Sequence, residues 1–177
     1  LPMVLGYDVA GEVIEKGEAV TEFDIGDSVV GFVGFPLIAG AYAQHIIATE
    51  SELSKTISHD NAYAALPLAG LTAYQGLFDI GKLQSGETVL ISGASGGVGY
   101  LAVQLALNAG ANVIAIAGLK NHELLKTLGD VTVIDYRNIN NFQTLPDIDL
   151  WLDLIGGDNA ISQLSAANNV SRLVTIP

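Results

Sequence analysis

The sequence predicts an α/β protein, in which a doubly wound parallel sheet follows a smaller all-β unit. From Glu87 onward, short apolar runs alternate with stretches whose apolar residues recur three and four apart, as strands alternating with helices do. Over residues 1–57, strand-like runs are separated by glycine turns, which is typical of a small sandwich or barrel. Hydrophobic residues make up 50% of the chain and charged residues 15%, which favours strands covered on both faces. We therefore expect two domains, at 1–57 and 58–177.

The first domain is expected to be built from strands and the second to open with helical segments. The predicted strands of the first domain are 9–15, 28–33 and 41–48. Asp60 is suited to cap a short helix at 61–65, because its carboxylate can accept from backbone N–H groups of the first turn. A longer helix, interrupted by glycines, is expected over 68–78.

The parallel sheet is expected to contain five strands, at 88–92, 112–117, 131–135, 148–154 and 172–176. The helices that join them are expected at 98–106, 122–128 and 160–167. A doubly wound dinucleotide-binding sheet usually has six strands, so this one is incomplete. The all-β unit is also too short to close by itself. We therefore expect a chain that is cut at both ends, or one completed by parts from elsewhere.

The stretch from Glu87 to Leu105, ETVLISGASGGVGYLAVQL, carries the main functional signal. A buried strand runs into a glycine-rich turn, and a helix opens directly from that turn. The N–H groups of a helix start bind phosphate, and glycines let a pyrophosphate approach the backbone. The Gly-x-Gly-x-x-Gly positions fall on Ala94, Gly96 and Gly99, with Gly93 just before the alanine. The strand, turn and helix together predict dinucleotide binding on a Rossmann-type sheet, rather than an ordinary tight turn.

The end of the second strand of this sheet indicates which dinucleotide is bound. NAD sites usually carry an acid there, which binds the ribose 2′-hydroxyl. Here Gly118 leaves room, Lys120 supplies positive charge, and the next acid is Glu123. Tyr136 and Arg137 end the third strand on the same edge and could reach a 2′-phosphate. The pattern favours NADPH over NADH, although Lys120 could instead be a solvated lysine and Tyr136 a packing aromatic.

The net charge, the absence of cysteine and the spacing of the histidines argue against nucleic-acid binding, disulfides and metal binding. A net charge of −12 would repel nucleic acid, whereas local N–H groups can still hold an anionic cofactor. The chain has no cysteine, so it has neither disulfides nor a cysteine-ligated zinc site. His45, His59 and His122 stand at no metal-ligand spacing and are expected to be surface or packing residues. We therefore expect no bound metal.

No segment of the sequence suggests a membrane or an exported protein. No apolar run reaches the roughly 18 residues that a membrane span requires. Residues 1–10 have no basic region and contain Asp8, unlike a signal peptide. The expected location is the cytoplasm, with no membrane partner.

Several stretches together resemble a known family. The second domain contains PLAGLTAYQGL (67–77), SGETVLISGASGGVGYLAVQLA (85–106), VIAIAG (113–118) and VTVIDY (131–136). The first domain contains LGYDVAGEV (5–13), FDIGDSVVGF (23–32) and GAYAQHI (40–46). These motifs resemble the zinc-free, zeta-crystallin-like quinone oxidoreductases of the medium-chain dehydrogenase/reductase superfamily. The resemblance implies that residues 1–57 are part of a GroES-like domain and that 58–177 form an NADPH-binding Rossmann domain.

The resemblance implies an enzyme that reduces a quinone or an α,β-unsaturated carbonyl with NADPH. Zinc-dependent relatives carry Gly-His-Glu where this chain has Gly6, Tyr7 and Asp8. A zinc-independent reaction is therefore expected. Asp8 could be a catalytic carboxylate, but a structural hydrogen-bonding role is favoured. No catalytic residue is assigned, since hydride transfer depends mainly on how cofactor and substrate are positioned.

The resemblance also assigns cofactor-binding residues. The backbone N–H groups of Ser95, Gly96, Gly97 and Val98 would hold the pyrophosphate. Gly118 and Lys120 would border the 2′-phosphate, with Tyr136 beside it. Thr72 would face the nicotinamide, or alternatively bond the backbone of its own helix. The expected set is Thr72, Gly93, Ala94, Ser95, Gly96, Gly97, Val98, Gly99, Gly118, Lys120 and Tyr136.

Two other functions share these motifs. An enoyl reductase that acts on thioester-bound chains would contain them all, and so would a truncated NADPH-binding module without catalytic activity. The family's substrate-facing segments are expected to lie outside this chain, so the substrate is not identified. Relatives are usually homodimers that pair through their nucleotide domains, and a homodimer is one expectation here.

Overall fold

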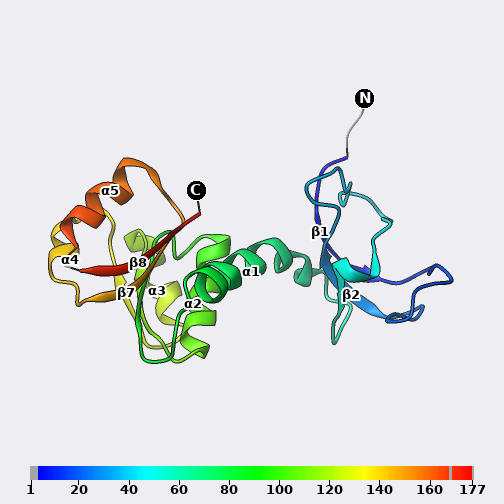
Figure 1. Cartoon of the computed structure of the whole chain (residues 1–177), viewed down its shortest axis with the longest axis horizontal. Helices are drawn as coiled ribbons and strands as arrows, with labels where there is room; N and C mark the ends of the chain where they lie inside the picture. The colour runs from blue at the N-terminus through cyan, green and yellow to red at the C-terminus, as the bar shows by residue number, and fades with distance from the viewer. Residues whose placement is uncertain (1–3, 168, 177) are drawn as a thin grey trace. The chain divides into compact units, whose positions relative to one another are not determined.

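A computed structural model describes residues 4–167 and 169–176, apart from the side chains of Asn141 and Asn159. The chain divides into two compact units, Leu1–Leu71 and Thr72–Pro177. Helix α1, Pro67–Tyr74, contains the boundary between them (Figure 1). The first unit contains a three-stranded antiparallel sheet and the second a five-stranded parallel sheet. The predicted fold class is confirmed.

The sheet of the first unit has the order β1-β2-β3, with β1 at Asp8–Glu12, β2 at Ser28–Phe32 and β3 at Leu53–Lys55. A 3₁₀ turn, η1 at Glu50–Glu52, precedes β3, and a second one, η2, spans Asn61–Ala65. The predicted cap of η2 is confirmed, because the Asp60 carboxylate accepts from the N–H of Ala62 at 2.8 Å. The small core of the first unit contains the buried side chains of Phe23, Val29 and Val33.

The strand predicted at 41–48 is wrong, and β3 takes its place. β3 pairs along one edge of β2 and β1 along the other, so β2 has no edge left for a further strand. Only the start of the 41–48 segment pairs, through bonds from Ala41 N–H to Gly6 O at 3.0 Å and from Tyr42 N–H to Leu5 O at 2.8 Å. The segment lines an open cavity of about 1130 Å³ together with β1. Its alternating apolar pattern is therefore not matched by a continuous partner strand among the described residues.

The sheet of the second unit has the order β6-β5-β4-β7-β8, and all its pairs are parallel. The strands are β4 at Thr88–Ile91, β5 at Asn112–Ile116, β6 at Val131–Ile134, β7 at Ile148–Asp153 and β8 at Val170–Thr175. The chain moves outward from β4 to β6 and then returns to the other side of β4. The order of the strands therefore reverses between β4 and β7, the point at which doubly wound sheets bind ligands.

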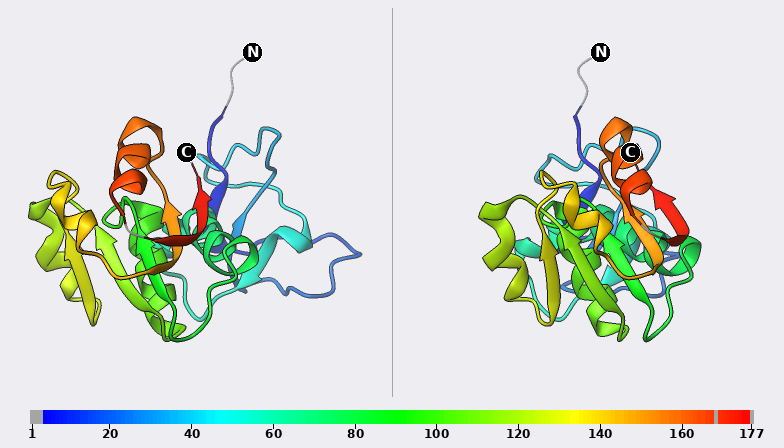
Figure 2. Two further views of the ribbon diagram at one scale, coloured as in Figure 1. Left: turned by 60° about the vertical axis from the view of Figure 1, so that its left-hand side comes forward. Right: turned by 90° about the vertical axis from the view of Figure 1, so that its left-hand side faces the viewer.

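Helices cover both faces of this sheet, and the layers can be followed in Figures 1 and 2. Besides α1, the helices are α2 at Gly97–Asn108, α3 at His122–Lys126, α4 at Asn140–Gln143 and α5 at Gly157–Ala166. Val89 and Ile91 of β4 belong to the core cluster that contains residues of α2 and α3. Leu90, between them, belongs to a second cluster that contains Phe142 of α4. Successive residues of β4 thus point to opposite, buried faces.

Three helices differ from the sequence prediction. The helix expected over 68–78 is divided into two parts. Its first part is α1, and the chain then continues as a π-helical turn, η3, at Gln75–Ile80. α5 begins at residue 157, earlier than expected, because Gly156 and Gly157 turn the chain with φ of 67° and 69°. The short helix α4 was not expected, and a brief 3₁₀ turn, η4, at Leu119–Asn121 leads into α3.

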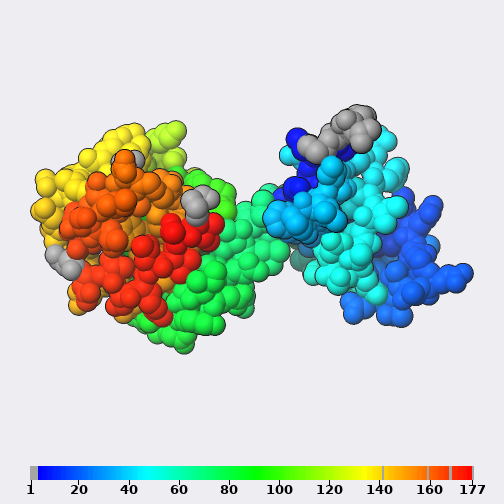
Figure 3. Space-filling model, turned by 45° about the horizontal axis from the view of Figure 1, so that its top comes forward, coloured from blue at the N-terminus to red at the C-terminus, as the bar shows by residue number. Residues whose placement is uncertain are grey.

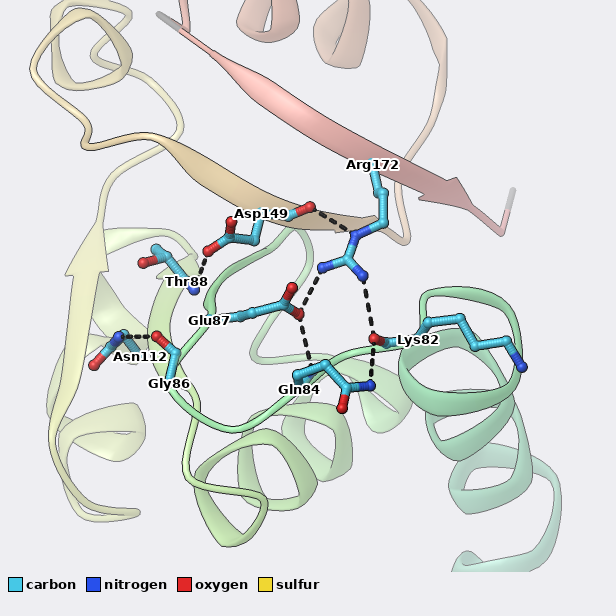
Figure 4. A network of polar contacts seen from close by, with 8 residues as sticks. All are labelled: Lys82, Gln84, Gly86, Glu87, Thr88, Asn112, Asp149 and Arg172. Carbon is cyan, nitrogen blue, oxygen red and sulfur yellow. Dashed lines mark hydrogen bonds and ion pairs between the residues drawn. The ribbon is translucent and has the colours of Figure 1, made fainter.

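The amino-terminal side of the parallel sheet is held together by Arg172 (Figure 4). Its guanidinium donates to the carboxylate of Glu87 at 2.6 Å, to the backbone carbonyl of Asp149 at 3.0 Å and to that of Lys82 at 3.1 Å. The Asp149 carboxylate in turn accepts from the N–H of Thr88 at 2.8 Å. One side chain of β8 therefore links β7 to the loop that leads into β4.

Candidate nucleotide-binding site

A cavity of about 780 Å³ opens at the carboxyl ends of the parallel strands in the second unit. It is lined by residues that follow β4, β5, β6, β7 and β8, and by the start of α2 and one side of α5. This is the edge at which the strand order reverses. The bottom of the cavity is the turn between β4 and α2.

The turn between β4 and α2 presents bare backbone to the cavity. Gly93 has a φ of 65°, which favours glycine, and its carbonyl accepts from the N–H of Gly96 at 2.9 Å. Gly96 is the N-cap of α2 and provides no side-chain cap. The N–H of Tyr100 makes the first bond of the helix, to Gly96 O at 2.8 Å. The N–H groups of Gly97 and Val98 have no helical partner, so they are available to a ligand, whereas the N–H of Gly96 is taken by Gly93 O.

Two glycines of α2 differ in the space around them: Gly99 packs against the turn, and Gly97 borders the cavity. A Cβ at Gly99 would overlap the Gly93 carbonyl oxygen and lie 2.7 Å from the Cα of Ala94. A Cβ at Gly97 would have no atom within 4 Å and would project into open space. Because Gly97 lines the cavity, a methyl group there would occupy the place that a bound group could take. A cradle of unpaired N–H groups at a positive helix end fits a pyrophosphate.

The side of the cavity that follows β5 and β6 is basic. Gly118, Lys120, Asn121, Tyr136 and Arg137 all line it. The guanidinium carbon of Arg137 lies 5.1 Å from the centre of the Tyr136 ring. A Cβ at Gly118 would lie 3.4 Å from that ring and 3.8 Å from the Arg137 guanidinium. Both are ordinary contact distances, so the Tyr136 ring and the Arg137 guanidinium lie directly beside the Gly118 backbone at the end of β5.

Asn121 connects this basic side to the turn between β4 and α2. Its side-chain amide donates to the Ser95 hydroxyl at 2.7 Å. Among the described residues that line the cavity, the one carboxylate is Asp153, at the end of β7. Asp153 is 2% exposed and accepts from the N–H groups of Ile155 and Gly156 and from the Thr175 hydroxyl, at 3.1–3.2 Å. Its charge is thus directed into its own turn and away from the basic side.

The comparisons with known proteins agree with this arrangement. A family model described as the alcohol dehydrogenase GroES-like domain matches residues 1–58. A chloroplast envelope quinone oxidoreductase homolog of Arabidopsis thaliana is 43% identical over 143 residues, which cover 77% of this chain and 43% of that protein. A 2-methylene-furan-3-one reductase of Solanum lycopersicum is 38% identical over 182 residues, covering 96% of this chain and 46% of that one. The solved quinone oxidoreductase of Coxiella burnetii superposes with a TM-score of 0.88 at 39% identity, covering 100% of this chain and 56% of its own.

The chain belongs to the quinone oxidoreductase-like family of medium-chain dehydrogenases/reductases. It spans about half the length of the relatives that it matches. The GroES-like match lies within the first compact unit, and the nucleotide-binding cavity lies within the second.

In this quinone oxidoreductase-like chain, most of the predicted cofactor residues line the one cavity. They are Gly93, Ser95, Gly96, Gly97, Val98, Gly99, Gly118, Lys120 and Tyr136. Ala94 does not line it: the residue is fully buried, and its N–H donates to Ile116 O at 3.1 Å. Thr72 does not line it either and lies in α1. The roles of all these residues toward a cofactor remain predictions.

The wall of the cavity that follows β7 contains none of the residues that were predicted from the sequence. That wall contains Leu154 and Ile155 after the strand, and Ala160 and Gln163 on α5. A signal for it was present in the sequence, because Asp153 is followed by Leu-Ile-Gly-Gly directly after a buried strand. This is a second strand, turn and helix of the same kind as the first.

Asp8 of the quinone oxidoreductase-like chain has a structural contact. One of its carboxylate oxygens accepts from the N–H of Leu68 at 2.7 Å, in the first turn of α1. A carboxylate is favourable at this end of a helix. Within the described part of the chain, no three histidine or acidic side chains come together to hold a metal ion. No described helix is long and apolar enough to cross a membrane.

Proposed function

We propose that this chain binds NADPH and serves the reduction of a quinone or an α,β-unsaturated carbonyl. The observation that carries the proposal is a cavity that joins a bare helix start to a basic end, with Asp153 as the one carboxylate among the described lining residues and that carboxylate accepting from its own turn. The helix start suits a pyrophosphate, and the basic end suits a 2′-phosphate. The names of the relatives, quinone oxidoreductase and 2-methylene-furan-3-one reductase, support the choice of acceptor.

Each part of the chain has a defined task in this proposal. When bound, NADPH supplies a hydride to the ring or the β-carbon of the acceptor, and a proton completes the reduction. The N–H groups of Ser95, Gly97 and Val98 would hold the pyrophosphate, since that of Gly96 donates to Gly93 O, while Lys120 and Arg137 would neutralise the 2′-phosphate. Tyr136, held under the Arg137 guanidinium, keeps that cation at the mouth of the site. The protein contributes binding and orientation, which are what a hydride transfer requires.

The preference for NADPH over NADH is tested at Lys120. We expect Lys120→Ala to weaken NADPH binding by about 10- to 100-fold, since a hydrogen bond to a charged group is worth about 1.5–3 kcal/mol. NADH lacks the 2′-phosphate, so its dissociation constant should change little. The measurement is nucleotide fluorescence titration. An equal loss for the two nucleotides would refute the role of Lys120.

Zinc independence is also part of the proposal. It is supported by the absence of cysteine from the sequence and by Tyr7-Asp8 in place of the His-Glu pair of zinc-dependent relatives. A chelator should leave the rate of NADPH oxidation unchanged. Metal analysis of the treated protein checks that no zinc remains. A loss of activity that added zinc restores would contradict it.

The acceptor is tested by mixing the chain with NADPH and a panel of quinones, enones and enoyl thioesters. Oxidation of NADPH by 9,10-phenanthrenequinone or by an enone supports the proposed function. Oxidation by an enoyl thioester alone would make the chain an enoyl reductase. Tight NADPH binding without turnover would make it a binding module.

A further inference from the structure

Gln163 is a buried polar residue whose side chain has no hydrogen-bond partner among the described residues. Three polar residues of the described chain are buried: Ser92, Asp153 and Gln163. Ser92 accepts a hydrogen bond from the Trp151 indole at 2.7 Å, and Asp153 accepts from three donors. The Gln163 side chain is different, because no described residue hydrogen-bonds its amide. Gln163 is only 9% exposed.

Gln163 lies on the side of α5 that lines the nucleotide cavity. Gln163 lines that cavity together with Ala160, which lies one turn earlier on the same side of α5. Ile161 and Leu164, by contrast, are 64% and 38% exposed. α5 itself forms part of the outer surface of the second unit (orange in Figure 3). No fully buried side-chain nitrogen or oxygen among the described residues lacks a partner, so the small exposed area of Gln163 includes its amide atoms.

The amide of Gln163 is free to bond a ligand, because no described residue occupies it and its atoms are not fully enclosed. A ligand in the cavity that pairs with both the carbonyl and the NH₂ group would use hydrogen-bonding capacity that the protein leaves open. Its neighbours on the wall are apolar, since Leu154, Ile155 and Ala160 line the same part of the cavity. The carboxylate of Asp153 is occupied by its own turn. The surroundings therefore suit a flat, uncharged group that has an apolar face and a hydrogen-bonding edge.

A nucleobase is such a group. We propose that Gln163 recognises the adenine base of the nucleotide, an inference that rests on the proposed function. The carbonyl oxygen of a glutamine amide can accept from the adenine N6 amino group while its NH₂ group donates to N7. Hypoxanthine carries an oxygen at position 6, so the amide oxygen would then face another acceptor. Gln163 is thus a specificity-determining residue for the base, separate from the groups that hold the phosphates.

The test compares NADPH with its hypoxanthine analogue, nicotinamide hypoxanthine dinucleotide phosphate. Dissociation constants are measured by fluorescence titration for the wild type and for Gln163→Leu, which keeps a similar volume. We expect the wild type to bind NADPH about 5- to 100-fold more tightly than the analogue, and Gln163→Leu to bind the two equally. Binding of 2′,5′-ADP, which has no nicotinamide, should weaken in the variant as much as NADPH binding does.

A matched control and a stability measurement separate recognition from structure. Gln104, on α2, already donates its side-chain amide to Tyr100 O at 3.0 Å and does not line the cavity. Gln104→Leu should therefore keep the preference for adenine. Without ligand, Gln163→Leu should not lower the melting temperature, because no described residue hydrogen-bonds the Gln163 amide.

Four results would overturn the inference. Two concern the base: the wild type binds NADPH and the hypoxanthine analogue equally, or Gln163→Leu keeps the preference for NADPH. Two concern the variant itself: Gln163→Leu binds 2′,5′-ADP as tightly as the wild type does, or its melting temperature without ligand falls markedly. A wild type that binds no NADPH at all would instead reject the proposed function, and the inference with it.

Discussion

The contact between Gly99 and the Gly93-Ala94 turn makes a quantitative prediction. In Gly99→Ala, the added methyl group would overlap the Gly93 carbonyl oxygen and lie 2.7 Å from the Ala94 Cα. Both neighbours are backbone, so either the helix start or the turn must move. Overpacking of this kind costs about 3 kcal/mol at the upper end of its usual range. The better helix propensity of alanine returns about 1 kcal/mol, which leaves a loss of about 2 kcal/mol.

The matched variant is Gly97→Ala, two residues earlier in the same helix. Its methyl group would have no atom within 4 Å, so the stability of the free protein should not fall. The same methyl group would stand in the cavity over the unpaired N–H groups, so NADPH binding should weaken by about tenfold or more. One alanine therefore affects folding and the other affects binding.

The assay is thermal unfolding without ligand, followed by NADPH titration. A loss of about 2 kcal/mol corresponds to a fall of about 4–8 °C in the melting temperature for a chain of this size. A Gly99→Ala protein that melts with the wild type would refute the close approach. A Gly97→Ala protein with wild-type NADPH affinity would refute the placement of the pyrophosphate.

Three further predictions concern other parts of the chain. Ser92→Ala leaves the buried indole N–H of Trp151 unpaired, so it should cost about 1–3 kcal/mol, as measured by unfolding followed by tryptophan fluorescence. Arg172→Met removes the ion pair to Glu87 and two bonds to carbonyl groups, and should cost about 1–3 kcal/mol in urea denaturation. Hydrogen bonds from two backbone N–H groups and a hydroxyl lower the pKa of Glu52 from 4.5, so its contribution to stability is present above that pH and is lost as the pH falls through the lowered value. Glu52→Gln should therefore lose less stability on acidification than the wild type, as measured by circular dichroism.

Each of these predictions has a result that contradicts it. An unchanged unfolding midpoint in Ser92→Ala would mean that the indole finds another acceptor. The control for Arg172 is Lys126→Met, which breaks the exposed pair with Glu123 and should cost well under 1 kcal/mol. Equal losses in Arg172→Met and Lys126→Met would show that the Arg172 network contributes no more than a surface pair. Parallel acid titrations of the wild type and Glu52→Gln would rule out the Glu52 effect.

The second unit could be predicted because its signals are local. An apolar run, a glycine turn and a helix of regular spacing identify β4 and α2 without reference to the rest of the chain. The 41–48 strand was wrong because alternation shows that a segment can be a strand but not which segment it pairs with. α4 was missed because four residues around Phe142 carry too little periodicity. Their helix depends on burying that ring against β5 and β7.

The part of the candidate site that is formed by backbone groups could be predicted from the sequence, and the part formed by side chains of α5 could not. The glycines between β4 and α2 indicate the turn in the sequence. Nine of the eleven predicted cofactor residues line the cavity at this turn. Gln163 could not be singled out, because its burial depends on how α5 packs and glutamines are usually exposed. Thr72 lies in α1 and does not line this cavity, so its expected position beside the nicotinamide stays a prediction.

The glycine N-cap of α2 has a consequence for how this unit responds to its ligand. Most helices carry a serine, threonine, asparagine or aspartate that completes their first turn, and α2 has Gly96 instead. A nucleotide that supplies the missing acceptors completes the secondary structure of the protein as well as occupying its site. Folding and occupancy are then linked by mass action, and a nucleotide at 100 times its dissociation constant adds about 2.7 kcal/mol to stability. Under the proposed function, the concentration of nucleotide around the protein would therefore set the equilibrium fraction of the second unit that is folded.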